Sequence, residues 1–477
     1  MQYAIWFVLL FLAALTMMGV YHARQIKSGQ DFALAGRRLG VGVLIGTLVA
    51  TWIGTGSIFG NAEKAYTHGI AILFVPIAGV LGILILSFLA PRVREMPADS
   101  VPEMLKIRFG RGAQVLGAVA LIASYLVIVS YQYRAGAAVA EKLFPHLAVS
   151  DNPVVNKHFF SVGFAIFVIL YTVLAGMVSV AWTDLVNGIL MTIGLLLALV
   201  FVLSRWNMKA NPLPDELLRP SGGMSALEWI SITLPALLLV LGDANLYQRF
   251  MSARSPAAAR TAAMGMFFGV MVLECVIILL ALAGRALLGG DLPHPGHVVI
   301  DLAFHSEIVP VPVGILLSMT VIAVIVTTAD SYLLGTATSA ATDLMGGLTS
   351  PGKQRLIVVV LGLIALGLSF TSDKFFSVAI YAYTLYGAVL TPAVLCALFL
   401  PRVNRKAILS AMAAGLFSAL AWKALMMKQL IPDLLRDVDA VLPALGANLL
   451  VLLVLGIILP TQPHDPHDPR QDRISHK

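Results

Sequence analysis

The stretch VPVGILLSMTVIAVIVTTADSYLLG (Val311–Gly335) is long and apolar enough to cross a bilayer, yet a carboxylate interrupts it. A membrane span needs about 20 mostly apolar residues. A charged side chain at membrane depth costs about 2.5–3.5 kcal/mol on insertion scales, so it normally faces protein or water and has a partner. Asp330, with hydroxyls at Thr327, Thr328 and Ser331, therefore predicts a polar site inside a membrane protein.

The composition of the whole chain indicates a polytopic membrane protein. Its 477 residues are 59% hydrophobic and 12% charged, with a mean hydropathy of +0.89, so a soluble core could not bury the apolar surface. The net charge of +7 does not predict a nucleic-acid partner, because the basic residues lie in short loops between apolar segments. Cys275 and Cys396 both fall inside expected spans, so they predict neither a disulfide framework nor a metal site.

Apolar segments of spanning length predict about thirteen transmembrane helices in a single domain, residues 1–460. They lie at 3–21, 40–60, 69–91, 113–140, 159–178, 182–204, 228–250, 262–288, 309–344, 355–371, 375–398, 407–427 and 441–460. Basic residues gather on one side, notably in Arg92–Gly112 and Pro401–Lys406, whereas the opposite loop Gly289–Glu307 is poor in them. With the basic side cytoplasmic, we expect a bacterial inner-membrane protein with its N-terminus outside and a disordered cytoplasmic tail at 461–477.

Two spans contain residues that weaken a helix. The second, within Gly40–Tyr66, carries Gly54, Gly56 and Gly60, and the seventh, within Ile232–Phe250, carries Pro235, Gly242 and Asp243. Two interrupted helices five spans apart run in opposite directions, which is how inverted-repeat transporters build a site at the membrane midplane. The alternative is that Gly56 and Gly60 form a small-residue packing face.

The ninth span has oxygen ligands suited to an alkali cation. Thr327 and Ser331 are spaced i,i+4, so their hydroxyls stack along one helical stripe beside Asp330. The alternative is that the threonines bond back to carbonyls one turn earlier. Asp184, a second acid at the start of the sixth span, supports the cation hypothesis, although an acid there could also cap the helix.

Four segments in order resemble the solute:sodium symporter family, which includes sodium-coupled sugar, proline, pantothenate, sialic acid and choline carriers. These segments are GMVSVAWTDLVNG (Gly176–Gly188), GDANLYQRFMSARS (Gly242–Ser255), TTADSYLLGTATSAATDL (Thr327–Leu344) and YAYTLYGAVLTPAVL (Tyr381–Leu395). The resemblance implies the LeuT-type fold of two inverted five-helix repeats, here about 40–204 and 228–398, with extra helices outside them. It also implies Na⁺ as the coupling ion.

The resemblance places a shared sodium site on two carbonyls of the second span and three groups of the ninth: Ala50, Ile53, Val324, Thr327 and Thr328. Some members of the family bind a second sodium ion, and the matching positions here are Asp184, Thr327 and Ser331. Asp330 is the fourth candidate for this second site, and it stands where hydroxyl residues are common in the family, a departure that could alter charge, stoichiometry or proton use.

The substrate-binding residues predicted are Trp52, Gly56, Ser57, Asp243 and Tyr247. The second span looks more like the choline-carrier branch than the sugar branch, with Trp52 and Glu63 at matching positions. An indole facing an ammonium group would make a cation–π contact, although Trp52 could equally be packing. Asp243 stands where that branch has an aromatic residue, and it could pair with an amine or cap the broken helix.

We therefore expect a sodium-coupled symporter that imports a small polar organic solute by alternating access, an amine or a zwitterion. The alternatives are a sugar, sialic acid or carboxylate carrier and, in other classes, a transceptor without net transport or a leak channel. No phosphate cradle or metal-ligand cluster supports an enzyme. The expected partners are the solute, sodium and the lipid bilayer, with no nucleic acid, and the expected state is a monomer.

Overall fold

The computed structural model describes most of the chain as helices and the loops between them. It describes residues 4–24, 26–147, 149–290, 292–347, 350–371, 375–400, 402–432, 435 and 438–461. The tail predicted at 461–477 lies outside the described residues, apart from Thr461. Over these ranges the chain forms no β-strand, only an isolated bridge between Leu39 and Ala253.

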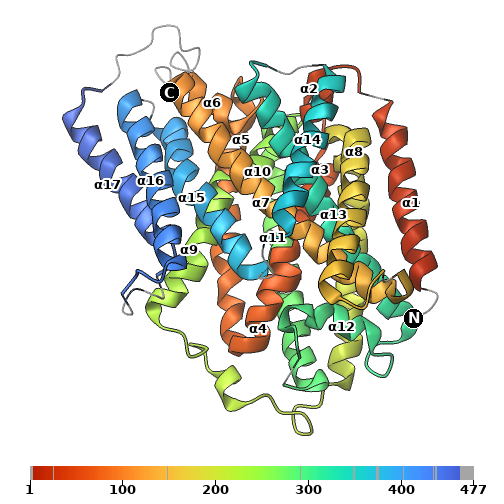
Figure 1. The fold of residues 1–477 in the computed structure, drawn as a ribbon. Coiled ribbons are helices and arrows are strands. Elements are labelled where there is room, and N and C mark those ends of the chain that lie inside the picture. Colours follow the sequence, from red (N-terminus) through yellow and green to blue (C-terminus); the bar gives the residue numbers. More distant parts are fainter. Residues whose placement is uncertain are drawn as a thin grey trace.

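The long helices stand side by side as one bundle (Figure 1), and short helices connect them. The helices of the bundle are α1 (Ala4–Ala23), α3 (Val41–Trp52), α5 (Val75–Glu95), α7 (Arg111–Leu143), α8 (Pro153–Arg205), α9 (Ala226–Gly242), α10 (Ala244–Ser252), α11 (Pro256–Leu288), α13 (Val311–Ser339), α14 (Pro351–Ser369), α15 (Phe375–Phe399), α16 (Arg405–Met427) and α17 (Val441–Ile458). The short ones include α2 (Gly29–Leu34), the π-helix η2 (Gly56–Asn61), α4 (Ala62–His68), α6 (Val101–Phe109), η6 (Pro295–His297), α12 (Val298–Phe304) and the π-helix η7 (Ala340–Leu344).

The prediction of an all-α polytopic membrane protein is confirmed. Among the described residues, eleven helices are long and apolar enough to cross a membrane. The first two predicted spans correspond to shorter apolar helices, Trp6–His22 and Val41–Trp52. The fifth and sixth spans run together as the 53-residue α8, which turns at Gly176 with φ 62° and ψ 173°, a backbone conformation that glycine adopts most readily.

Both predicted interruptions are breaks in the helices. After α3, Ile53 is extended at φ −72° and ψ 91°, and the chain resumes as η2 and α4. After α9, Asp243 at φ −59° and ψ 111° separates that helix from α10. The α3 and α10 halves lie toward the α6 end of the bundle, and α4 and α9 toward the α12 end (Figure 1). Each break frees backbone groups that a continuous helix would have paired.

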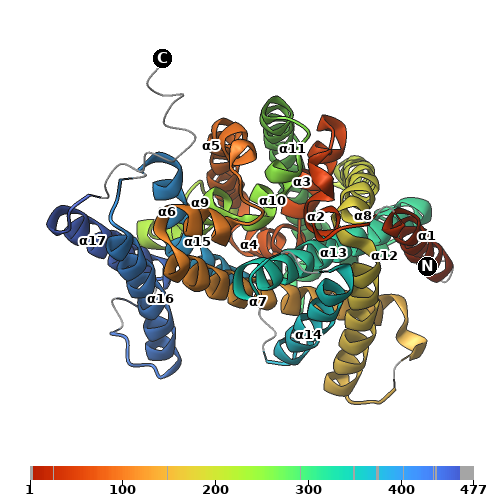
Figure 2. The same cartoon turned by 90° about the horizontal axis from the view of Figure 1, so that it is seen from above.

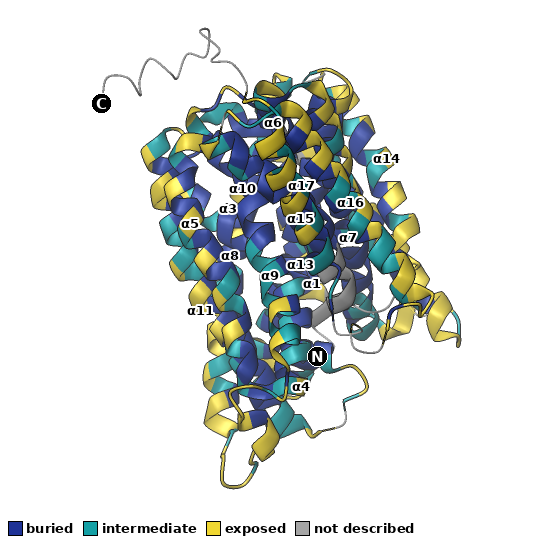
Figure 3. Ribbon diagram, turned by 90° about the vertical axis from the view of Figure 1, so that its left-hand side faces the viewer, coloured by how far each residue is buried: buried dark blue, intermediate teal, exposed yellow. Residues whose placement is uncertain are grey.

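Helix α13 forms the centre of the bundle. Every residue from Thr320 to Ala340 is buried, and the helix packs against both α7 and α8. By contrast, α16 and α17 lie at one edge, as the view from above shows (Figure 2). Their outer faces carry exposed apolar side chains such as Phe417 and Ile457, and the exposed positions line the outside of the bundle (Figure 3). A bilayer would cover these faces.

The loop regions separate into two ends of the molecule. The basic segment with α6 and the region of α2 lie at one end, and α12 with residues 292–305 lies at the other (Figure 1). At the α6 end, backbone bonds join the residues flanking the two broken helices. Leu39 N–H donates to the Ser252 carbonyl at 3.0 Å, and Arg254 N–H donates to the Leu39 carbonyl at 2.9 Å.

Candidate functional site

Thr327 brings oxygen atoms of α3 and α13 together. Its hydroxyl lies 2.9 Å from the Ala323 carbonyl, 3.1 Å from that of Val324 and 3.4 Å from that of Ala50. The bond to Ala323 is the backward helical bond that offered the alternative explanation for this threonine. The contact with Ala50 crosses to the other repeat, directly before the break in α3. Three of the five predicted sodium ligands therefore converge.

Thr328 faces the same break without a partner of its own. Its hydroxyl is buried and makes no hydrogen bond within the described part of the chain. A Cβ atom added to Gly54 would lie 2.9 Å from this hydroxyl, so only glycine lets the break approach α13 so closely. Ile53, the residue before Gly54, is fully buried. A buried hydroxyl without a partner calls for an explanation, and an oxygen-ligated cation would provide one.

The cation beside Asp184 in this structure is Arg249, a residue that the sequence analysis did not single out. Arg249 Nη2 lies 3.1 Å from Asp184 Oδ2, and both side chains are almost completely buried. Thr47 donates to the same Oδ2 at 2.5 Å and accepts from Arg249 Nε at 2.8 Å. Arg249 Nη2 also donates to the Ser331 hydroxyl at 2.8 Å. Two of the residues predicted for a second sodium site, Asp184 and Ser331, thus bind the guanidinium.

Asp330 adds a second buried carboxylate to this cluster. Its Oδ1 accepts a long bond of 3.4 Å from Ser331, while its Oδ2 and Asp184 Oδ1 are buried without a partner among the described residues. Thr327 was also predicted for the second site, but its hydroxyl faces the Ala50 carbonyl of the shared site. Of the candidates for a second sodium site, Asp184 lies on α8 and Thr327, Asp330 and Ser331 lie on α13. The guanidinium of Arg249 lies between Asp184 and Ser331.

Asp243 caps the helix that follows the second break. Its Oδ1 accepts from the Asn245 N–H at 2.8 Å and from the Tyr125 hydroxyl at 2.6 Å, and its Oδ2 accepts from Tyr332 at 3.2 Å. Tyr247 donates to the Leu241 carbonyl at 2.8 Å across the same break. Both side chains are buried, and neither lines the pocket described next. Their contacts stabilise the broken helix.

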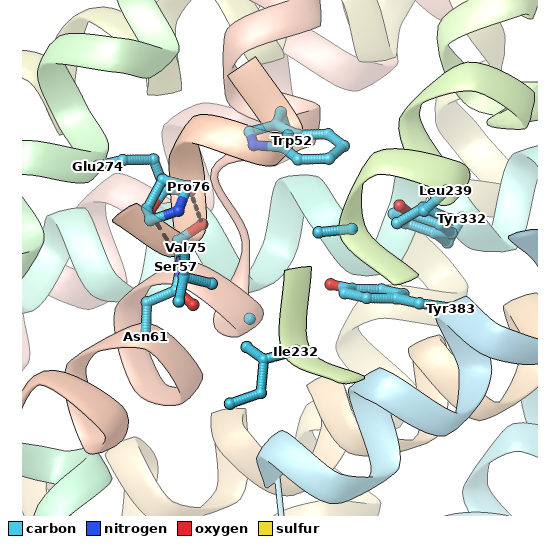
Figure 4. Close-up of a pocket in the computed structure, with 13 residues that line it drawn as sticks. Trp52, Ser57, Asn61, Val75, Pro76, Ile232, Leu239, Glu274, Tyr332 and Tyr383 are labelled. Atoms are coloured by element: carbon cyan, nitrogen blue, oxygen red, sulfur yellow. Dashed lines mark hydrogen bonds between the residues drawn. The ribbon is translucent and has the colours of Figure 1, made fainter. Parts of the chain in front are cut away.

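A pocket lies between the two broken helices, with about 650 Å³ of free space including its mouth (Figure 4). Three residues predicted to bind substrate line it: Trp52, Gly56 and Ser57. A Cβ atom on Gly56 would lie 2.7 Å from the Tyr383 hydroxyl, so the absence of a side chain at this position lets Tyr383 approach the backbone closely. Tyr332 also lines the pocket, one helical turn after Thr328, which connects the pocket with the shared sodium residues.

Glu274 on α11 is the acidic residue of the pocket wall and was not predicted. Its side chain is 3% exposed. Its Oε1 accepts from Ser57 at 2.6 Å and its Oε2 from Asn61 at 3.0 Å, and the Trp52 indole also interacts with this carboxyl group. The sequence contains the signal for it, because a lone acid in an apolar span, like Asp330, predicts a buried polar site.

Comparison with known proteins identifies the family. A model of the sodium:solute symporter family matches residues 32–415. The chain is 26% identical to the high-affinity proline transporter PutP of Bacillus subtilis over 438 residues, which cover 85% of this chain and 89% of that protein. It is 25% identical to a sodium/proline symporter of Haemophilus influenzae over 448 residues, 87% of each chain.

Solved structures agree on the fold. A Na⁺-coupled sialic acid symporter in a substrate-bound, outward-open state matches with a TM-score of 0.80 at 15% identity, covering 97% of this chain and 99% of that one. Mhp1, a nucleobase-cation-symport-1 family transporter, matches with a TM-score of 0.62 at 14% identity, covering 93% and 98%. The LeuT-type fold is thereby confirmed. Since the family model covers most of the chain, the protein belongs to the sodium:solute symporter family and is a sodium-coupled membrane transporter, not an enzyme.

Proposed function

We propose that this protein imports a small amine-bearing solute, a cation or a zwitterion, together with sodium across the bacterial inner membrane. A single chain is the transporting unit in this proposal. The sodium ion binds Ala50, Ile53, Val324, Thr327 and Thr328. The convergence of Thr327 with Ala50 and Val324, and the unpaired hydroxyl of Thr328, support this assignment.

The observation that carries the proposed substrate class is the charge of the pocket. Its thirteen lining residues include one carboxylate, Glu274, and no Lys, Arg or His. Trp52 and two tyrosines, Tyr332 and Tyr383, supply aromatic surface to the same pocket. Carboxylates and aromatic faces attract an ammonium group, whereas an anionic solute would meet an unfavourable charge.

The relatives support a solute that contains an amine. The two relatives described above are named as transporters of proline, whose free form carries an ammonium group and a carboxylate. The structural neighbour that carries sialic acid is only 15% identical, so its likeness concerns the fold and not the solute. Asp243, the acid first considered for the amine, already accepts bonds from the Asn245 N–H of its own helix and from Tyr125 of α7 and Tyr332 of α13, so Glu274 takes over that role in this proposal.

Uptake into proteoliposomes tests the proposal. We expect proline, choline or glycine betaine to accumulate only with an inward sodium gradient, and with saturation. A hexose, pantothenate and sialic acid serve as the comparison solutes. Accumulation of the hexose or of an anionic acid alone would contradict the amine assignment. Sodium-dependent binding without accumulation of any solute would favour a transceptor, and non-saturable flux would favour a leak channel.

A further inference from the structure

Glu274 is a buried carboxylate near the middle of a long apolar helix. It lies in α11, Pro256–Leu288, and its side chain is almost wholly removed from solvent. Side chains of this kind at membrane depth are costly, and they normally mark a site and have a partner. The packing of α11 against α3, α4 and α5 places the carboxylate beside the first broken helix.

The protein supplies Glu274 with neutral hydrogen-bond donors. Ser57 and Asn61 each donate to one carboxylate oxygen, at 2.6 and 3.0 Å. Within the described residues no Lys or Arg forms an ion pair with it. Two carboxylate oxygens offer about four acceptor sites, so acceptor capacity remains after these two bonds and the interaction with the Trp52 indole. A buried negative charge is stabilised far better by a hydrogen-bonded cation than by neutral donors alone.

The pocket that Glu274 lines has room for a cationic group that would pair with this carboxylate. Trp52, Ser57 and Asn61 line that pocket too, so the acid and its donors form one wall (Figure 4). Ser57 and Asn61 are spaced i,i+4 on η2, the segment that follows the break beside Ala50 and Ile53. A cation bound at Glu274 would thus contact the same broken helix that supplies carbonyls to the proposed sodium site.

We infer that Glu274 is the specificity-determining residue of the pocket and accepts a hydrogen bond from an N–H group of the transported ammonium. This inference rests on the proposed function and specifies its substrate class. The solute is an ammonium that retains at least one N–H, because only an N–H donor uses the remaining acceptor sites of the carboxylate. A quaternary ammonium would keep the charge attraction and lose that bond.

Binding of two matched probes to the purified protein in sodium-containing buffer tests the inference. The probes are L-proline, which has N–H donors, and its N,N-dimethyl derivative, which has none. We expect the parent protein to prefer L-proline and Glu274→Gln to lose at least about tenfold in affinity for it, because a charge-assisted hydrogen bond is removed. Glu274→Asp should recover part of that loss. Cys275→Ser, a change at the exposed neighbouring position, is the control.

Sodium affinity measured without organic solute distinguishes this role from a structural one. It should stay within about twofold of the parent in Glu274→Gln, because the sodium residues do not contact Glu274. Equal losses of proline and sodium affinity would overturn the inference in favour of a structural role. So would unchanged proline affinity, or a loss only of pH dependence, which would indicate a proton acceptor.

The two proposals fail in different ways. If the parent protein accumulates no amine with sodium, the proposed function is wrong and this inference falls with it. If sodium drives amine uptake while Glu274→Gln keeps the parent affinity, only the inference about Glu274 is wrong. Preference of the parent protein for the dimethyl probe would also overturn the N–H requirement alone.

Discussion

At the scale of single residues, the two adjacent threonines of α13 have different environments. Thr327 is bonded to carbonyls of its own helix and approaches Ala50, whereas Thr328 has a buried hydroxyl without a partner among the described residues. Removing a hydroxyl that already has a backbone partner costs little, but removing a cation ligand costs affinity for the cation. Thr328 is therefore the sharper test of the sodium site.

Replacing Thr328 by Ala should lower the apparent sodium affinity by roughly tenfold, because losing one buried polar partner costs about 1–3 kcal/mol. The helix and the amount of protein should be unchanged. The measurement is the sodium dependence of uptake at saturating solute. Thr192→Ala is the matched control, since the Thr192 hydroxyl bonds back to Gly188 in α8. Parent-like sodium activation in Thr328→Ala would remove this residue from the site.

At the scale of elements, the Arg249 cluster connects helices from both repeats. Thr47 of α3, Asp184 of α8, Arg249 of α10 and Ser331 of α13 meet through the guanidinium. Breaking one member of a buried ion pair is costly because the other charge remains buried. The cluster thus holds α3 and α10, one half of each broken helix, against α8 and α13.

Replacing Asp184 by Asn should destabilise the protein by about 3–5 kcal/mol, since Arg249 would lose its carboxylate partner. Combining it with Arg249→Met should cost less than the sum of the two single changes, because the double variant removes both charges. Thermal unfolding of the four proteins in detergent measures this coupling. Parent-like stability in Asp184→Asn together with weakened sodium activation would instead support Asp184 as a ligand of a second sodium ion.

Elements were more predictable than the contacts between them. Hydropathy predicted the spans, and Gly54, Gly242 and Asp243 predicted both helix breaks, because helix-weakening residues act locally. Arg249 escaped notice because its partners lie far away in sequence, and no local pattern encodes such a meeting. Glu274 could have been predicted in the same way as Asp330, because both are acids in apolar spans. The joining of the fifth and sixth spans through a turn at Gly176 could not, since a glycine in an apolar span has many explanations.

At the scale of the whole molecule, the two sets of loops are at opposite ends of the bundle. The segment with α6 and the segment with α12 are separated by the length of the helices (Figure 1). Which end faces the cytoplasm stays a prediction from the distribution of basic residues. The orientation can be tested by labelling single cysteines at exposed positions on each end.

Single cysteines placed at His294 and Lys106 should label differently in intact cells. In a background without Cys275 and Cys396, an impermeant maleimide should modify the cysteine at 294, because we expect that loop to be outside. The cysteine at 106 should react only after permeabilisation. Both positions are exposed in the structure, so burial does not explain a difference. Labelling of 106 but not 294 in intact cells would reverse the predicted orientation.

The bridge at the α6 end has a mechanical consequence. It ties Leu39, two residues before the start of α3, to the end of α10 through two main-chain hydrogen bonds, from Leu39 to Ser252 and from Arg254 to Leu39. Since no side chain takes part, most substitutions at these positions leave the bonds intact, and only a proline in place of a donor removes one directly. Each bond contributes about 0.5–1.5 kcal/mol net, which solute and ion binding can readily offset. Together the two bonds therefore contribute about 1–3 kcal/mol to holding Leu39 beside Ser252 and Arg254.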